Sequence, residues 1–242
     1  MQLGGSSSDG PAPTDIAEAL RTGARELGHR PAVTVLHPGA RYEQSGVSLA
    51  NWAAKGAHLL ELDHLVGPGS TVGLQAPPCW TSASVALATW WLGGTVSLLV
   101  GGSTDVTVGH RASAGDQDAA LAALLVGDGV DGAPLAADPA TPPTVPAWTH
   151  EAQPLPDQPP PAQAQAALPA LRTAQRTWQQ AELLGLAAEL GTGTAGVEAG
   201  RTDPVSALVA VALRPFVTGQ ATVVLRGVGR DTAAGEKVRT WL

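Results

Sequence analysis

Six residues of this chain, Gly191 to Gly196, fit the GxGxxG string of a nucleotide-binding loop. In dinucleotide-binding folds these glycines follow a strand and open a helix, so that the phosphates meet the N-terminus of that helix. Here the string follows a predicted helix that ends near Leu190. Because glycine commonly ends a helix, we interpret it as a helix stop and a flexible loop, not as a phosphate site.

A second candidate site consists of His58, Glu61 and His64, near the end of a predicted helix. Imidazole and carboxylate groups bind zinc, and two histidines on one helix do so when they stand four residues apart. Positions six apart differ by about 240° around a helix, so His58 and His64 do not share a face. We therefore expect these side chains to be solvated and expect no metal.

Three more residues have side chains that enzymes use as nucleophiles or proton carriers. Ser103 follows two glycines, but no GxSxG elbow occurs and no base stands beside it. Cys79 precedes an apolar helix whose N-terminus would lower a thiol pKa, although a buried, inert thiol is the commoner case. Lys237 is interpreted as a solvated surface lysine. We assign no catalytic, cofactor-binding or metal-binding residue.

Composition restricts the classes of partner. The formal net charge is −7 and the only lysines are Lys55 and Lys237, which argues against binding to nucleic acid or to an anionic membrane. One cysteine excludes an internal disulfide and a paired-cysteine metal site. The opening MQLGGSSSDGPAPTD has neither the basic nor the apolar run of a secretory signal, so we expect a cytoplasmic protein.

The elements that would position these residues alternate between helices and apolar strands. The clearest unit is a strand at 71–75, a helix from Pro77-Pro78 to Leu92, and a strand at 95–99. Residues 65–104 carry no charge, but prolines and glycines break them into pieces too short to span a membrane. Two apolar strands joined by one helix imply a right-handed parallel crossover.

The rest of the chain follows the same alternation. We expect further strands at 32–36, 106–108 and 221–225. One further helix is expected from the Asp15–Glu18 capping box to Gly28, a second is expected to be capped by Ser48, and a third to start at Asp116. Two more are expected over 177–190 and over 203–217, and Gly219 ends the last of them. The predicted fold class is α/β, with parallel strands flanked by helices.

Four segments are predicted along the chain. Residues 1–13 are a disordered lead, and 14–132 form a first α/β subdomain. Residues 133–169 are a Pro-rich connector, extended over the surface with polyproline character, for which a role as a docking ligand is the alternative. Residues 170–242 form a second α/β portion, packed with the first as one domain.

The order of several motifs resembles the start of the adenylate-forming superfamily, which includes acyl-CoA synthetases and the adenylation domains of peptide synthetases. The motifs are RPAV, SLANWAAKGAHLL, VGPGSTVGLQAPPCW and ALATWWLGGTVSLL, followed later by TWQQAELLGLAAEL and DPVSALVAVALRPFVTGQATVVL. More narrowly, the chain is similar to an uncharacterised actinobacterial family of short AMP-dependent-synthetase-like proteins. The resemblance implies part of the N-terminal domain of these enzymes.

The resemblance also implies an ATP loop rich in Ser, Thr and Gly, with a lysine, just before the helix predicted at 177. Residues Leu168 to Arg176 read LPALRTAQR, with no glycine and no lysine. The family's adenine-binding and magnesium-linked segments and its lysine-bearing C-terminal domain map onto no residue here. We therefore expect a truncated pseudoenzyme that acts as a binding or interaction protein, with no cofactor. ATP or AMP is implied by the resemblance alone.

Two alternatives stay open. The first is acyl-activating, ligase-like chemistry or adenylate binding, completed by a partner chain that supplies the lysine and the magnesium ligands. The second is that an apolar face, covered in complete enzymes, docks onto another protein or onto a second copy of the chain.

Overall fold

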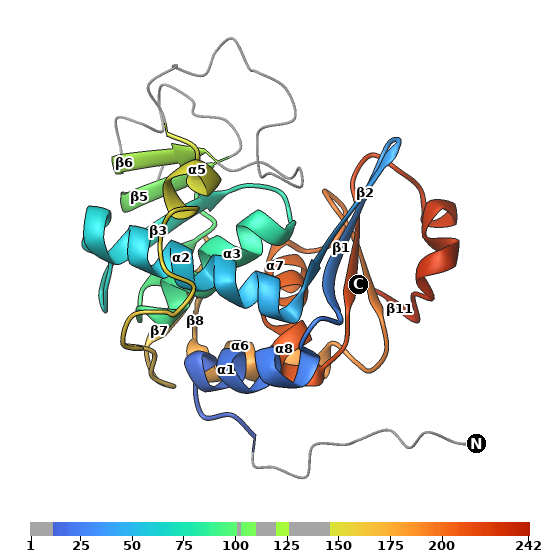
Figure 1. Cartoon of the computed structure of the whole chain (residues 1–242), viewed down its shortest axis with the longest axis horizontal. Helices are drawn as coiled ribbons and strands as arrows, with labels where there is room; N and C mark the ends of the chain where they lie inside the picture. Colours follow the sequence, from blue (N-terminus) through green and yellow to red (C-terminus); the bar gives the residue numbers. More distant parts are fainter. Residues whose placement is uncertain (1–11, 101–102, 110–119, 126–145) are drawn as a thin grey trace.

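The computed structural model describes residues 12–100, 103–109, 120–125 and 146–242. Within these residues the chain forms two sheets with helices between and beneath them (Figure 1). The helices are α1 (Ile16–Leu27), α2 (Gly46–His64), α3 (Trp80–Trp91), α5 (Trp148–Ala152), α6 (Gln180–Glu189), α7 (Pro204–Ala212), α8 (Arg214–Thr218) and the 3₁₀ helix η1 (Arg230–Glu236).

Both sheets are mostly parallel. The first has the order β11 (Thr240–Trp241), β9 (Ala195–Glu198), β10 (Thr222–Leu225), β1 (Pro31–His37) and β2 (Ala40–Ser45). The second has the order β6 (Ala120–Leu125), β5 (Thr104–Gly109), β3 (Thr71–Gln75), β4 (Thr95–Ser97), β7 (Pro169–Arg172) and β8 (Thr177–Gln179). The β1–β2 and β7–β8 pairs are antiparallel hairpins, and every other pair is parallel. The predicted α/β class and the parallel pairing of β3 with β4 are confirmed.

Helix α3 forms the centre of the molecule because it carries no charged side chain. All its residues are buried, and it contacts strands of both sheets. A helix that is apolar on all sides belongs in a protein interior. The indole N–H groups at its C-terminal end still find acceptors: Trp90 donates to the carbonyl of Ala170 at 2.6 Å and Trp91 to that of Pro160 at 2.8 Å. No helix in the described ranges has both the length and the apolar character of a membrane span.

A buried glutamine ties three helices together at the base of the fold. The Gln180 side chain, fully buried at the start of α6, donates to the carbonyl of Trp90 at 3.0 Å and accepts from the amide of Ile16 at 3.3 Å. A buried amide group is tolerated only when its hydrogen bonds are made inside the protein. These two hydrogen bonds therefore fix the start of α6 against the start of α1 and the end of α3.

The outer face of the first sheet is covered by η1. Alternate residues of β10, Val223 and Leu225, form a small second core with Leu36 and Ala233. The remaining β10 side chains lie on the inner face, where Thr222 donates to the carbonyl of Ala210 on α7. This alternation follows from the two-residue period of a strand.

Several sequence predictions about element boundaries are wrong. The single helix expected over 203–217 is divided at Leu213 into α7 and α8, and the strand expected at 95–99 ends at Ser97. The described part of the helix expected from Asp116 is strand β6, because a short run of Ala and Leu is ambiguous and the open edge of β5 supplies backbone partners. The helix expected from Thr177 begins at Gln180, after β8. Helix α2 is capped by Ser45 rather than Ser48, whose amide instead donates to the Ser45 hydroxyl at 3.2 Å.

The described part of the Pro-rich connector, residues 146–169, runs over the surface but is fastened to the helices. It begins with α5, whose Trp148 is fully buried against Gly56 of α2. Lys55 then holds the chain through the carbonyls of Gln153 at 3.0 Å and Leu155 at 2.5 Å, and through Asp157 at 3.0 Å. These contacts make this stretch an ordered part of the fold, while the predicted domain boundaries stay predictions.

Candidate functional site at the carboxyl ends of the strands

A large cavity lies where strands of the second sheet end. It encloses about 750 Å³ and adjoins a second cavity of about 380 Å³, with which it shares Leu98, Asp203 and Pro204. Its walls come from the segment after β4, from the turn between β7 and β8, and from the first turn of α7. Ligands of open α/β sheets bind outside the carboxyl ends of the strands, so these joined cavities, here called the cleft, form the candidate site.

The turn between β7 and β8 occupies the place of the expected ATP loop. Thr173 donates its amide to the carbonyl of Arg176 at 2.9 Å, which closes a tight four-residue turn. The Thr173 hydroxyl accepts the amides of Gln175 at 3.2 Å and Arg176 at 3.3 Å. Three of the four turn amides are thus bonded within the turn. The sequence prediction that this segment lacks a phosphate loop is in keeping with this geometry.

Arg176, which lines the larger cavity of the cleft, already has two partners. Its Nη2 lies 2.6 Å from Oε1 of Glu182, and its guanidinium stacks over the Trp178 ring at 4.7 Å. Glu182 also accepts the amide of Gln179 at 2.7 Å, as part of the capping box that starts α6. The arginine therefore belongs to a small surface network, in which an exposed ion pair contributes little stability.

Asp203 is the carboxylate of the cleft, and it caps α7. Its Oδ2 accepts the amide of Ser206 at 2.9 Å and the hydroxyl of the same residue at 3.0 Å. Asp203 and Pro204 stand at the N-cap and N1 positions that these residue types favour, as the sequence predicted. Apart from these polar groups the larger cavity has mostly apolar walls, which include Leu98, Leu99, Val100, Trp178, Leu186 and Val205.

The GxGxxG string follows α6, as the sequence predicted, and its last two residues, Ala195 and Gly196, begin β9. Its backbone is fixed by a buried cation, because Arg214 donates to the carbonyls of Gly191 at 3.2 Å and of Gly193. The same guanidinium donates to Gln220 and Ala221, and burial lowers the pKa of Arg214 to about 10. The prediction of a flexible loop missed this anchor, for which the one sequence signal is an arginine inside the apolar run of 205–217.

The three side chains considered as metal ligands do not converge. His58 Nε2 lies 2.8 Å from the carbonyl oxygen of Gln158, and Glu61 accepts from the side chain of Gln163 at 3.4 Å. His64 is half-buried, and this burial lowers its pKa. Among the described residues no group of His, Cys, Asp and Glu side chains has the arrangement of a metal site.

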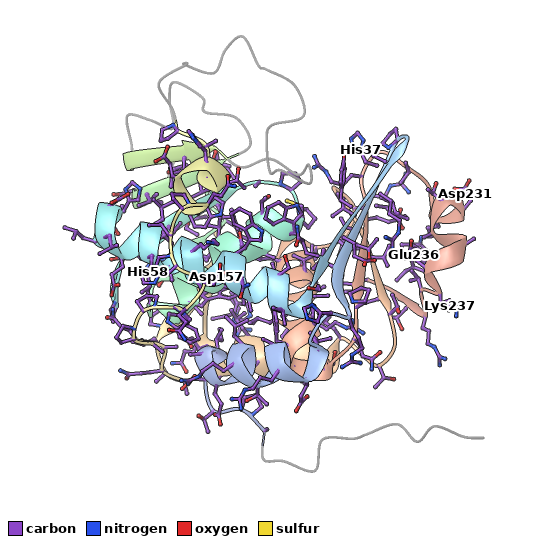
Figure 2. The ribbon with its side chains drawn as sticks, viewed as in Figure 1. His37, His58, Asp157, Asp231, Glu236 and Lys237 are labelled. Carbon is purple, nitrogen blue, oxygen red and sulfur yellow. The ribbon has the colours of Figure 1, made fainter. Side chains whose placement is uncertain are left out.

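The three candidate nucleophiles also lie apart. Cys79 is buried at the N-cap of α3, where its Sγ lies 3.0 Å from the Thr81 hydroxyl. Ser103 is exposed just before β5. Lys237 is exposed at the end of η1, and Figure 2 shows its side chain extending away from the ribbon. No shared site brings these three residues together.

Comparison with known proteins supports a fold relationship. No family model matches the chain. A TIGR03089 family protein of Mycobacterium tuberculosis is 46% identical over 55 residues, which make up 23% of each chain.

Solved structures match nearly the whole chain. A coronafacic acid ligase from Pectobacterium brasiliense superposes with a TM-score of 0.70 and 12% identity, covering 91% of this chain and 47% of the ligase. A fatty acyl CoA synthetase of Mycobacterium tuberculosis superposes with a TM-score of 0.67 and 11% identity, covering 94% of this chain and 49% of the synthetase. The N-terminal domain of FACL13 from the same organism superposes with a TM-score of 0.68 and 12% identity, covering 95% of this chain and 62% of that domain's chain.

The chain thus spans about half the length of the two complete ligases that it matches. At this low identity the likeness concerns the fold. The chain has the fold of the N-terminal domain of acyl-CoA synthetases, as its resemblance to the adenylate-forming enzymes predicted.

Proposed function

We propose that this chain is a non-catalytic binding or interaction protein built on the adenylate-forming fold, and that it does not form adenylates by itself. The observation that carries the proposal is the turn between β7 and β8. Its amides at Thr173, Gln175 and Arg176 are bonded within the turn. A triphosphate needs several free amides in a concave loop, and commonly a lysine, to offset its charge.

The cleft supports a binding role. Its larger cavity, about 750 Å³, falls within the range of roughly 300–1,000 Å³ that is usual for small-molecule sites. Mostly apolar walls with a few polar groups are also typical of such sites. Loss of the phosphate loop thus does not close the space beside it.

The test is calorimetric titration of the purified protein with ATP and magnesium, then with a non-hydrolysable acyl-adenylate mimic. We expect no saturable heat with ATP, and no ATP–pyrophosphate exchange in a parallel assay. Adenylate formation by the pure protein would contradict the proposal.

If the mimic binds, variants locate it. Trp178→Ala should weaken binding because Trp178 lines the cleft, whereas Tyr42→Ala, at a half-buried aromatic residue of β2 in the first sheet, is the matched control. Equal loss in both variants would mean that the cleft is not the site.

The second candidate is acyl-activating chemistry completed by a partner chain. Two facts favour it: the cleft is open, and the chain spans about half the length of the matched ligases. Its test is the same exchange assay after addition of a chain that supplies the missing lysine and magnesium ligands. Turnover only in the mixture would favour this candidate over the first.

A further inference from the structure

A separate, polar cavity of about 410 Å³ lies at the carboxyl ends of β9 and β10 in the first sheet. Glu198 and Arg201 line it from the β9 side, and Gly227, Val228, Gly229 and Arg230 line it from the β10 side. None of these six residues lines the cleft's larger cavity, and Arg201 alone among them also lines its smaller cavity. The adjacent parallel strands bring together two loops that lie far apart in the sequence.

Two guanidinium groups in this cavity are held in place by one carboxylate. Arg230 Nε donates to Oε1 of Glu198 at 2.5 Å, and Arg201 Nη1 donates to Oε2 at 3.2 Å. The Arg230 guanidinium also stacks over the ring of Trp241 at 4.6 Å. These contacts direct both guanidinium groups towards the cavity, but as exposed ion pairs they hold the side chains only weakly.

The cavity keeps an excess of positive charge and of donors. Glu198 offsets one of the two guanidinium charges, and it stays ionised because hydrogen bonding to Arg230 lowers its pKa. Within the described residues no acceptor is bonded to Nη1 of Arg230 or to Nε and Nη2 of Arg201. Asp231 is absent from the lining, although its carboxylate lies beside Gly229, where an added Cβ would be 2.5 Å from Oδ1.

The glycine-containing loop contributes backbone donors. In the described part of the chain, no backbone or side-chain oxygen accepts the amides of Gly227, Val228 and Gly229. Gly227 has φ of +68°, a conformation that glycine adopts without strain. Successive free amides beside a left-handed residue are the arrangement from which anion-binding nests are built.

We propose that this cavity binds a small phosphate monoester through Arg201, Arg230 and the amides of residues 227–229. Guanidinium forks match phosphate oxygens in geometry, and amide groups supply further donors without adding charge. A dianion also fits a cavity whose lining residues, Arg201, Arg230 and Glu198, together carry positive charge. The proposal does not rest on the function proposed for the cleft, although Arg201 lines both this cavity and the cleft's smaller cavity.

The experiment is a titration of the whole, ¹⁵N-labelled protein with inorganic phosphate and then with glycerol 3-phosphate, followed by amide chemical shifts. We expect saturable shifts at Gly227, Val228 and Gly229, with tighter binding of the ester if it is the natural class. Arg201→Gln should weaken binding about tenfold, since a hydrogen bond to a charged group is involved. The Arg201 side chain is 83% exposed, so its loss does not threaten folding.

Arg25→Gln is the matched control, because Arg25 is an exposed arginine on α1, remote in sequence from the cavity. The proposal is overturned if phosphate causes no saturable shifts in the 227–229 loop. It is also overturned if sodium chloride at equal ionic strength causes the same shifts, or if the two variants bind alike.

The same spectra separate this proposal from the proposed function. ATP that shifts only residues 227–230 occupies the new site and leaves the non-catalytic proposal intact. ATP that shifts residues 173–178 contradicts the proposed function and says nothing against the new site.

Discussion

Replacing Gly23 by alanine tests the closest helix contact in the fold. A Cβ at this position of α1 would lie 2.2 Å from the carbonyl oxygen of Phe216 and 2.5 Å from its Cα, both backbone atoms of α8. Alanine gains about 1 kcal/mol over glycine in a helix interior, whereas overpacking a core costs about 1–3 kcal/mol. Because backbone cannot rotate away, we expect the upper end of that cost. The net loss is about 1–2 kcal/mol, or roughly 2–8 °C in Tm.

The matched control is Gly185→Ala on α6, where no atom lies within 4 Å of the added Cβ. This variant should gain about 0.5–1 kcal/mol from helix propensity alone. The assay is urea unfolding of both variants, followed by circular dichroism and by tryptophan fluorescence. Truncation of the Phe216 side chain should not rescue Gly23→Ala, since the contact is with backbone. A Gly23→Ala variant as stable as the wild type would refute the reasoning.

Three further predictions concern buried groups. Arg214→Met should lower the free energy of unfolding by about 3 kcal/mol or more, because four carbonyls lose a charged donor. An unchanged midpoint of urea unfolding would contradict this. Trp148→Ala should lower the free energy of unfolding by about 3–5 kcal/mol. Gly56→Ala should destabilise the wild type but not the Trp148→Ala variant, because the added Cβ would lie 2.3 Å from the Trp148 ring. A double-mutant cycle of the two substitutions that shows no coupling would disprove the contact. Burial lowers the pKa of His64, so that as the pH falls the unfolded state takes up a proton before the folded state does. The stability of the fold should therefore fall as the pH drops from 6.5 towards the lowered pKa of the folded state. His64→Gln should remove this part of the pH dependence, as measured by thermal unfolding.

Local signals in the sequence predicted most of the central elements. The charge-free stretch between Pro78 and Gly93 can form a helix only in an interior, and α3 is fully buried. Asp15 and Asp203 cap the two helices that the capping box after Asp15 and the proline after Asp203 predicted to start there. Such features depend on neighbours within a few residues, so the sequence alone contains them.

Elements that depend on distant partners were mispredicted or missed. Strand β8 forms because residues 177–179 pair with β7, although the same letters continue a helical pattern. Strand β6 forms at the edge of β5 in the same way. An arginine inside an apolar run marks Arg214 in the sequence, but its acceptors could not be predicted because they belong to two separate loops.

The sequence by itself therefore determined the α/β class and the missing glycines and lysine between residues 168 and 176, since composition and short-range spacing specify both. Tertiary structure alone decided that the turn bonds its own amides, that a cleft stays open beside it, and that Arg201 and Arg230 meet on Glu198. The physical reason is that hydrogen bonds and ion pairs form between atoms close in space, and only the packing of the two sheets sets which atoms those are.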